Sequence, residues 1–75
     1  MTAFELQKHL DEWYPGQFIA ENVDPTDLTR VRRRGHGRDF EDEDLVGLYD
    51  LRENETLTLE MIKEDVDHFL IEGTG

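Results

Sequence analysis

Two glutamate–histidine pairs come closest to the spacing of a metal site in this 75-residue chain. His9 follows Glu5 by four residues, and His68 follows Glu64 by four. On helices each pair lies on one face, and two such faces brought together could bind a transition metal. With 19 acidic residues in the chain, such pairs arise by composition alone. We therefore expect no metal site.

The acidic run from Asp39 to Asp44 does not match a calcium-binding loop. A loop begun at Asp39 has Asp44 where the sharp turn needs glycine, and Asp50 where such loops end in glutamate. Residues 35–37, Gly-His-Gly, follow no strand pattern and are not typical of a phosphate-binding loop. The run instead suits the first turn of a helix, where acids are favourable.

The absence of serine and cysteine excludes further chemistry. No serine nucleophile and no thiolate zinc site can form, and a carrier protein would need a serine for its phosphopantetheine group. No pair of acids stands out as a catalytic dyad, because so many acids are present. The sequence predicts a protein that is not an enzyme, with no cofactor and no small-molecule substrate.

The charge is distributed unevenly along the chain. Five arginines lie between Arg30 and Arg38, and the acids that follow at once balance them. The rest of the chain therefore carries the whole net charge of −11, which opposes the approach of DNA.

This acidity favours a protein partner with a basic surface, because association by charge complementarity needs no other motif. We interpret the protein as a small non-enzymatic regulator or inhibitor, whose carboxylates bind such a partner by mimicking the charge of nucleic acid. The residues expected to contact the partner are Asp39, Glu41, Asp42, Glu43, Asp44, Asp50 and Glu53.

Residues 24–38 support an alternative, because they resemble the second half of a phage-repressor type of helix-turn-helix domain. Asp24 and Pro25 are typical of a helix start. The first half of the motif departs from the pattern, since Phe18 occupies a position that needs a small residue. This alternative is a DNA-binding regulator whose DNA-facing residues are Thr26, Thr29, Arg30, Arg33 and Arg34.

The elements that must position these residues are expected to be helices. We expect one acidic domain over residues 1–75, mainly α, as a bundle of four to five short helices. Thr2 and Glu5 form a capping-box pattern before apolar residues at helical spacing, which predicts a helix over 3–14. Residues 17–23 fit either helical turns or a short strand. Further helices are expected to begin at Asp24, at Asp39, and at Thr56 or Thr58, with Gly73 ending the last one.

An α+β fold with a short hairpin around residues 48–60 is the competing interpretation. Residues 48–51 and 56–60 alternate apolar and polar side chains, as strands do. We favour helices because residues 62–71 keep helical spacing. The first and last helices are then expected to pack together through Leu6, Leu10, Ile62, Val66 and Phe69.

The chain has enough apolar material for a small folded domain, since hydrophobic residues make up 36% of it. No apolar run approaches the ~18 residues of a membrane-spanning helix. The first ten residues show no signal-peptide pattern. We expect a cytoplasmic protein without membrane contact.

Overall fold

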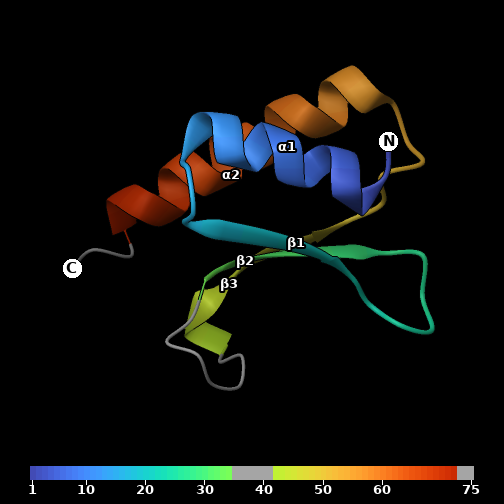
Figure 1. The fold of residues 1–75 in the computed structure, drawn as a ribbon, viewed down its shortest axis with the longest axis horizontal. Helices are drawn as coiled ribbons and strands as arrows, with labels where there is room; N and C mark the ends of the chain where they lie inside the picture. The colour runs from blue at the N-terminus through green and yellow to red at the C-terminus, as the bar shows by residue number, and fades with distance from the viewer. Residues whose placement is uncertain (35–41, 73–75) are drawn as a thin grey trace.

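The computed structural model describes residues 1–34 and 42–72 (Figure 1). Helix α1 (Ala3–Trp13) is followed by strands β1 (Phe18–Asn22) and β2 (Thr29–Arg33), a short 3-10 helix η1 (Asp42–Asp44), strand β3 (Leu45–Tyr49) and helix α2 (Glu55–Glu72). The strands form one antiparallel sheet in the order β1-β2-β3, and both helices lie on the same side of it. The predicted bundle of four to five helices is therefore wrong, because the described chain is an α+β fold with two α-helices.

The first predicted helix is confirmed as α1, together with its capping box. The Thr2 hydroxyl accepts a hydrogen bond from the Glu5 N–H at 3.2 Å, and the Glu5 carboxylate accepts one from the Thr2 N–H at 3.3 Å. Gly16 ends this region with a φ of +73°, a left-handed conformation that glycine adopts without strain. Of the two alternatives for residues 17–23, the strand is the one that forms, as β1.

The helix predicted from Asp24 is wrong. Residues 24–28 form a turn, and Thr29–Arg33 forms β2. Thr29 and Val31 are buried while the arginines between and after them are more exposed, which is the two-residue period of a strand. The described part of residues 24–38 thus contains no recognition helix.

The helix predicted from Asp39 is also not formed in the described residues, although residues 39–41 themselves lie outside them. Only the three-residue η1 is helical, and Leu45–Tyr49 is a strand. Val46 and Tyr49 of that strand are residue types that suit a sheet, and Gly47 disfavours a helix. The competing interpretation gave the right fold class, α+β, but its hairpin around 48–60 is wrong, because residues 56–60 lie inside α2.

The last predicted helix is confirmed as α2, but it begins earlier than expected. The Asn54 side-chain oxygen accepts a hydrogen bond from the Leu57 N–H at 3.1 Å, so Asn54 caps the helix in place of Thr56 or Thr58. Thr58 is instead buried within it. The expected stop at Gly73 lies outside the described residues. None of the helices in the described ranges is both long and apolar enough to cross a membrane.

The core lies between the two helices and the sheet. The sheet adds Phe18, Val31 and Tyr49 to it, and the Phe18 ring meets the Phe69 ring edge-on at 6.0 Å between centroids. The predicted packing of the two helices is confirmed, because the core includes Leu6, Leu10, Ile62 and Val66, with Phe69 packed against them.

Candidate functional site

The outer edge of β1 is closed by a side chain from α1. The Gln7 Nε2 donates a hydrogen bond to the Phe18 carbonyl oxygen at 2.9 Å, and the Ala20 N–H donates one to the Gln7 Oε1 at 2.9 Å. One amide thus satisfies a backbone acceptor and a backbone donor, as a neighbouring strand would. This removes part of the exposed pairing surface that makes an edge strand adhesive.

These two bonds also show how the backbone groups of β1 and β2 are oriented. Consecutive residues of a strand direct their N–H and C=O groups to opposite sides. Since Phe18 and Ala20 direct theirs outward, Glu21 directs its own toward β2, where it lies opposite Arg30. The backbone of Arg30 therefore bonds toward β1.

The alternation continues into β3. Next to Arg30, Thr29 and Val31 direct their backbone groups toward β3. Their partners there are Tyr49 and Gly47, which therefore bond inward. Leu48, between them, is left with its N–H and C=O pointing away from the sheet. Within residues 1–34 and 42–72, no further strand pairs with this outer edge of β3.

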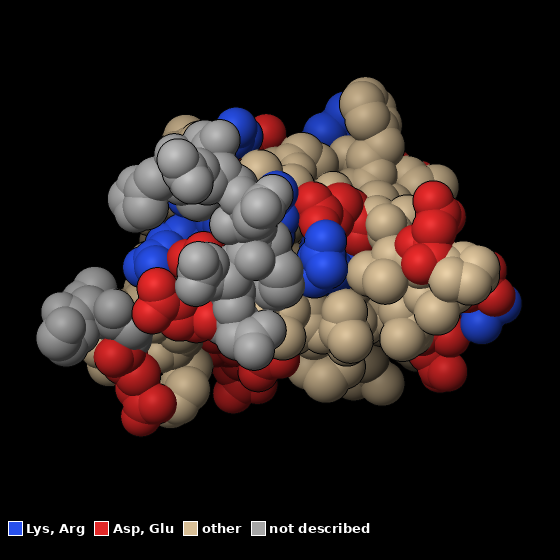
Figure 2. Space-filling view, turned by 90° about the horizontal axis from the view of Figure 1, so that it is seen from below, with Lys and Arg blue, Asp and Glu red and all other residues tan. Residues whose placement is uncertain are grey.

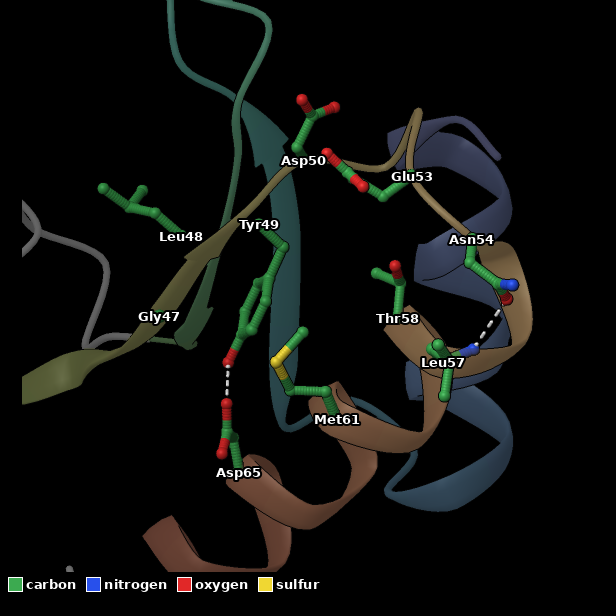
Figure 3. A pocket seen from close by; sticks show the side chains of 10 residues that line it. All are labelled: Gly47, Leu48, Tyr49, Asp50, Glu53, Asn54, Leu57, Thr58, Met61 and Asp65. Carbon is green, nitrogen blue, oxygen red and sulfur yellow. Dashed lines mark hydrogen bonds between the residues drawn. The ribbon is translucent and has the colours of Figure 1, made fainter.

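A groove with a volume of about 550 Å³ lies between this free edge and the first half of α2 (Figure 3). The Tyr49 ring forms one wall, and Leu57 and Met61 of α2 form the other. Leu57 is 62% exposed and Met61 is 48% exposed, so both offer apolar surface to solvent. The Leu48 side chain, 50% exposed, points to the opposite face of the strand (Figure 3).

Tyr49 is held in place by its neighbours. Its hydroxyl donates a hydrogen bond to the Asp65 carboxylate at 2.7 Å. Its ring lies against Gly47, where a Cβ atom would come within 2.5 Å of the hydroxyl oxygen. Burial, and then the bond to Asp65, raise the pKa of Tyr49, so the side chain stays neutral and acts as a donor.

Carboxylates lie at both ends of the groove. Asp50 and Glu53 lie at one end and Asp65 at the other (Figure 3). Hydrogen bonds from Arg52 lower the pKa of Asp50 and keep it ionised. Of the ten described residues that line the groove, three are acids and none is lysine or arginine. The groove is therefore apolar in the middle and negative at its ends.

The acidic run predicted to contact a partner is only partly described. Asp39 and Glu41 lie outside the described residues. Asp42 and Glu43 belong to η1, where the Glu43 side chain is exposed to solvent.

The remaining predicted contact residues are in two different places. Asp44 is 8% exposed, and its carboxylate accepts hydrogen bonds from Arg33 at 2.8 and 3.1 Å, so it is used inside the fold. Asp50 and Glu53 line the groove beside β3. The structure therefore brings only these last two of the predicted residues to one described site.

The residues of the DNA-binding alternative are also dispersed. Thr26 is exposed in the turn between β1 and β2, whereas Thr29 is 4% exposed in the core. Arg33 stacks over the Phe69 ring at 5.6 Å in addition to binding its acid. The Nε of Arg34 donates to the Gly16 carbonyl oxygen at 3.0 Å. These side chains do not project together from one element.

Arg30 and Arg32 bind one carboxylate on the face of the sheet that the helices leave uncovered. Both form ion pairs with Glu21 of β1, the Arg32 pair at 3.2 Å. Burial opposes the ionisation of Glu21, but the hydrogen bonds from the two arginines outweigh it and lower its pKa. Figure 2 shows basic and acidic side chains intermixed on this face.

Comparisons with models of protein families, with curated proteins and with solved structures gave no match for this chain.

In the described ranges, no three potential ligands converge as a metal site would require. The His9 Nδ1 lies 3.9 Å from the Glu12 Oε2, and the His68 Nε2 lies 3.3 Å from the Glu72 Oε2. Each histidine thus has an acid neighbour on its own helix that differs from the one considered in the sequence. The groove beside β3 is the candidate functional site.

Eight of the ten described groove residues were absent from the predicted site, among them Leu57, Met61 and Asp65 of α2. The predicted packing face of the last helix used Ile62, Val66 and Phe69. That assignment leaves Leu57 and Met61 as a second apolar pair with a spacing of four, on another face of the helix. This spacing was the feature of the sequence that could have predicted an exposed apolar surface on α2.

Proposed function

We propose that this protein is a non-enzymatic binding domain that takes a basic, partly apolar segment of a partner protein into the groove between β3 and α2. The supporting observation is the exposed apolar surface of Leu57 and Met61 between carboxylates at both ends. Apolar area contributes free energy of association, and the carboxylates select for positive charge. The net charge of −11 steers a basic partner toward the domain from a distance.

Regulation or inhibition follows from which partner is bound. A basic segment that otherwise contacts nucleic acid would be blocked when it lies in the groove. The carboxylates of Glu53 and Asp65 would then replace phosphate groups as its partners, with a smaller contribution from Asp50, which already pairs with Arg52. The protein would act as a competitor for that segment and would need no catalytic group.

The arginines give less support to the alternative of DNA binding. Glu21 binds two of them, and Asp44 binds Arg33. Phosphate contacts carry most of the affinity for DNA, and charge that is already neutralised within the fold contributes less to them. The acidic groove favours a protein partner.

A random-peptide display library selected on the protein tests the proposal. We expect the enriched peptides to carry lysine or arginine on both sides of apolar residues. Enrichment of acidic peptides, or no enrichment at all, would contradict the proposal. The consensus peptide, made synthetically with a fluorescent label, then serves as the probe for measuring affinity by anisotropy.

A pair of charge reversals locates the binding. Glu53→Lys changes an exposed acid at the end of the groove, and Glu12→Lys makes the same charge change on α1. We expect Glu53→Lys to weaken the consensus peptide about tenfold and Glu12→Lys less than about threefold, since close charges contribute more than distant screened ones. Equal effects would mean general attraction to the acidic domain, without a site in the groove.

A further inference from the structure

We infer that the partner segment binds as an extended strand paired with the outer edge of β3. This inference rests on the proposed function, because it assigns the binding mode at the same groove. The occupant is a basic extended segment of another protein, and its backbone would bond to the backbone of Leu48.

The first supporting observation is the contrast between the two edges of the sheet. On β1, Gln7 bonds to the outward groups of Phe18 and Ala20. On β3, the N–H and C=O of Leu48 point outward, and no described residue bonds to them. A free edge of this kind is a template for an added strand.

The second observation is that the groove runs beside that edge. A strand added to β3 would direct every second side chain toward α2, because the side-chain period of a strand is two. Those side chains would contact Leu57 and Met61 in the middle of the groove. Residues about 7 Å further along the added strand, in either direction, would approach the carboxylates at its ends. The site therefore suits apolar residues flanked by lysine or arginine at alternate positions.

The charge of the groove opposes a second copy of this chain as the occupant. Two β3 edges paired with each other would bring the Asp50, Glu53 and Asp65 carboxylates of both copies close together. Arg52 pairs with Asp50, but no ion pair within the described residues neutralises Glu53 or Asp65, so these carboxylates of the two copies would repel each other.

A helical occupant is less suited to the edge. A helix satisfies its own backbone, so it would cover the Leu48 N–H and C=O without bonding to them. A polar group that is covered without a hydrogen-bond partner lowers the affinity of the complex. An extended segment supplies both a donor and an acceptor at this position.

A single-atom change in a chemically synthesised chain tests the pairing. Replacing the amide between Gly47 and Leu48 with an ester removes the Leu48 N–H and keeps every side chain. We expect the consensus peptide from the selection to bind about tenfold more weakly, the factor that corresponds to one lost hydrogen bond. The melting temperature should fall only slightly, because the N–H itself does not bond within the sheet, while the ester carbonyl of Gly47 is a weaker acceptor toward Val31 of β2.

The control variant is Leu48→Ala, which keeps the N–H and removes the side chain. We expect it to change the affinity of the consensus peptide less than the ester does. Hydrogen exchange provides a second measurement: the Leu48 amide should exchange at least about tenfold more slowly when the peptide is bound. The Gly47 and Tyr49 amides, already paired with β2, should change less.

The outcomes separate this inference from the proposed function. If the peptide binds the ester chain as tightly as the natural chain, strand pairing is overturned while groove binding stands. If no basic peptide is selected, the proposed function itself fails. If Leu48 exchange slows with rising protein concentration in the absence of peptide, a second copy occupies the edge and the inference is overturned.

Discussion

The two edges of the sheet meet different helices, and the chemistry of those helices decides whether each edge is closed. α1 places Gln7 beside β1, and its amide offers both a donor and an acceptor to the strand. α2 places the apolar side chains of Leu57 and Met61 beside β3, together with the Asp65 carboxylate, which accepts its hydrogen bond from Tyr49. No described side chain bonds to the Leu48 backbone, so the edge at β3 is open where the edge at β1 is closed.

The two sides also differ in how they are packed. Phe18 of β1 is completely buried, and its ring meets the rings of Tyr14 and Phe69 edge-on. The Tyr14 hydroxyl donates to Asp67 on α2, and Lys63 binds the same carboxylate at 2.7 Å. The β3 side instead has exposed apolar residues. Stability should therefore be concentrated at β1, and binding at β3.

The largest expected effect tests this division. Phe18→Ala should lower the free energy of unfolding by about 3–5 kcal/mol, because it empties a buried aromatic site. Met61→Ala on the β3 side should cost less than about 1 kcal/mol, since the side chain is half exposed. Urea unfolding of the two variants measures both values. Similar costs would mean that the groove wall is part of the core.

Removing the closure of β1 should have the next largest effect. Gln7→Leu leaves the Phe18 carbonyl and the Ala20 N–H without their partner, which should cost about 1–3 kcal/mol. The variant should also associate at high concentration, because the β1 edge is opened. Thermal unfolding and analytical ultracentrifugation measure these changes. A monomeric Gln7→Leu chain of natural stability would show that this bond does not protect the edge.

A similar loss of stability, but without association, is expected from Gly47→Ala at the other edge. The added methyl group collides with the Tyr49 ring and must displace it from Asp65, at a cost of about 1–3 kcal/mol. The cost should fall when Tyr49 is also changed to phenylalanine, because the closest contact is with the hydroxyl oxygen. A double-mutant cycle in urea measures this coupling, and strict additivity would contradict the collision.

The smallest effect concerns alkaline pH. Burial, and then the hydrogen bond to Asp65, raise the pKa of Tyr49 in the fold above its ordinary value of 10.0. The fold therefore favours the neutral form of the side chain over the ionised form. The resulting stability is fully present below pH 10 and is lost as the pH rises through the raised pKa. Tyr49→Phe should therefore lose less stability between neutral and strongly alkaline pH than the natural chain does. Melting temperatures across this range measure it, with Tyr14→Phe as the comparison variant.

The sequence by itself determined the features that depend on local spacing and composition. The capping box of Thr2 and Glu5 and the apolar spacing of residues 62–71 predict α1 and α2, because caps and helical periods act within a few residues. Likewise, the excess of acids and the absence of serine and cysteine restrict the chemistry without any knowledge of the fold. Asp50 and Glu53 were predicted as contact residues on charge alone, and both line the groove.

Only the tertiary structure decided the sheet. Leu28 and Val31 have helical spacing, yet Thr29 and Val31 have strand spacing, so a segment this short fits both patterns. Pairing with β1 and the ion pairs to Glu21 settle it as a strand. The acids of residues 39–44 were expected to balance the charge of the arginines, and among the described residues only Asp44 forms such an ion pair, with Arg33.

The site was decided in the same way. Asp50 and Glu53 belong to a groove because α2 lies beside β3, and Leu57, Met61 and Asp65 join them from residues further along the chain. Gln7 closes one edge because α1 returns over β1 and brings its amide to the outward backbone groups. Edges and grooves depend on which elements become neighbours in space, and that arrangement minimises the free energy of the whole chain rather than of any one segment.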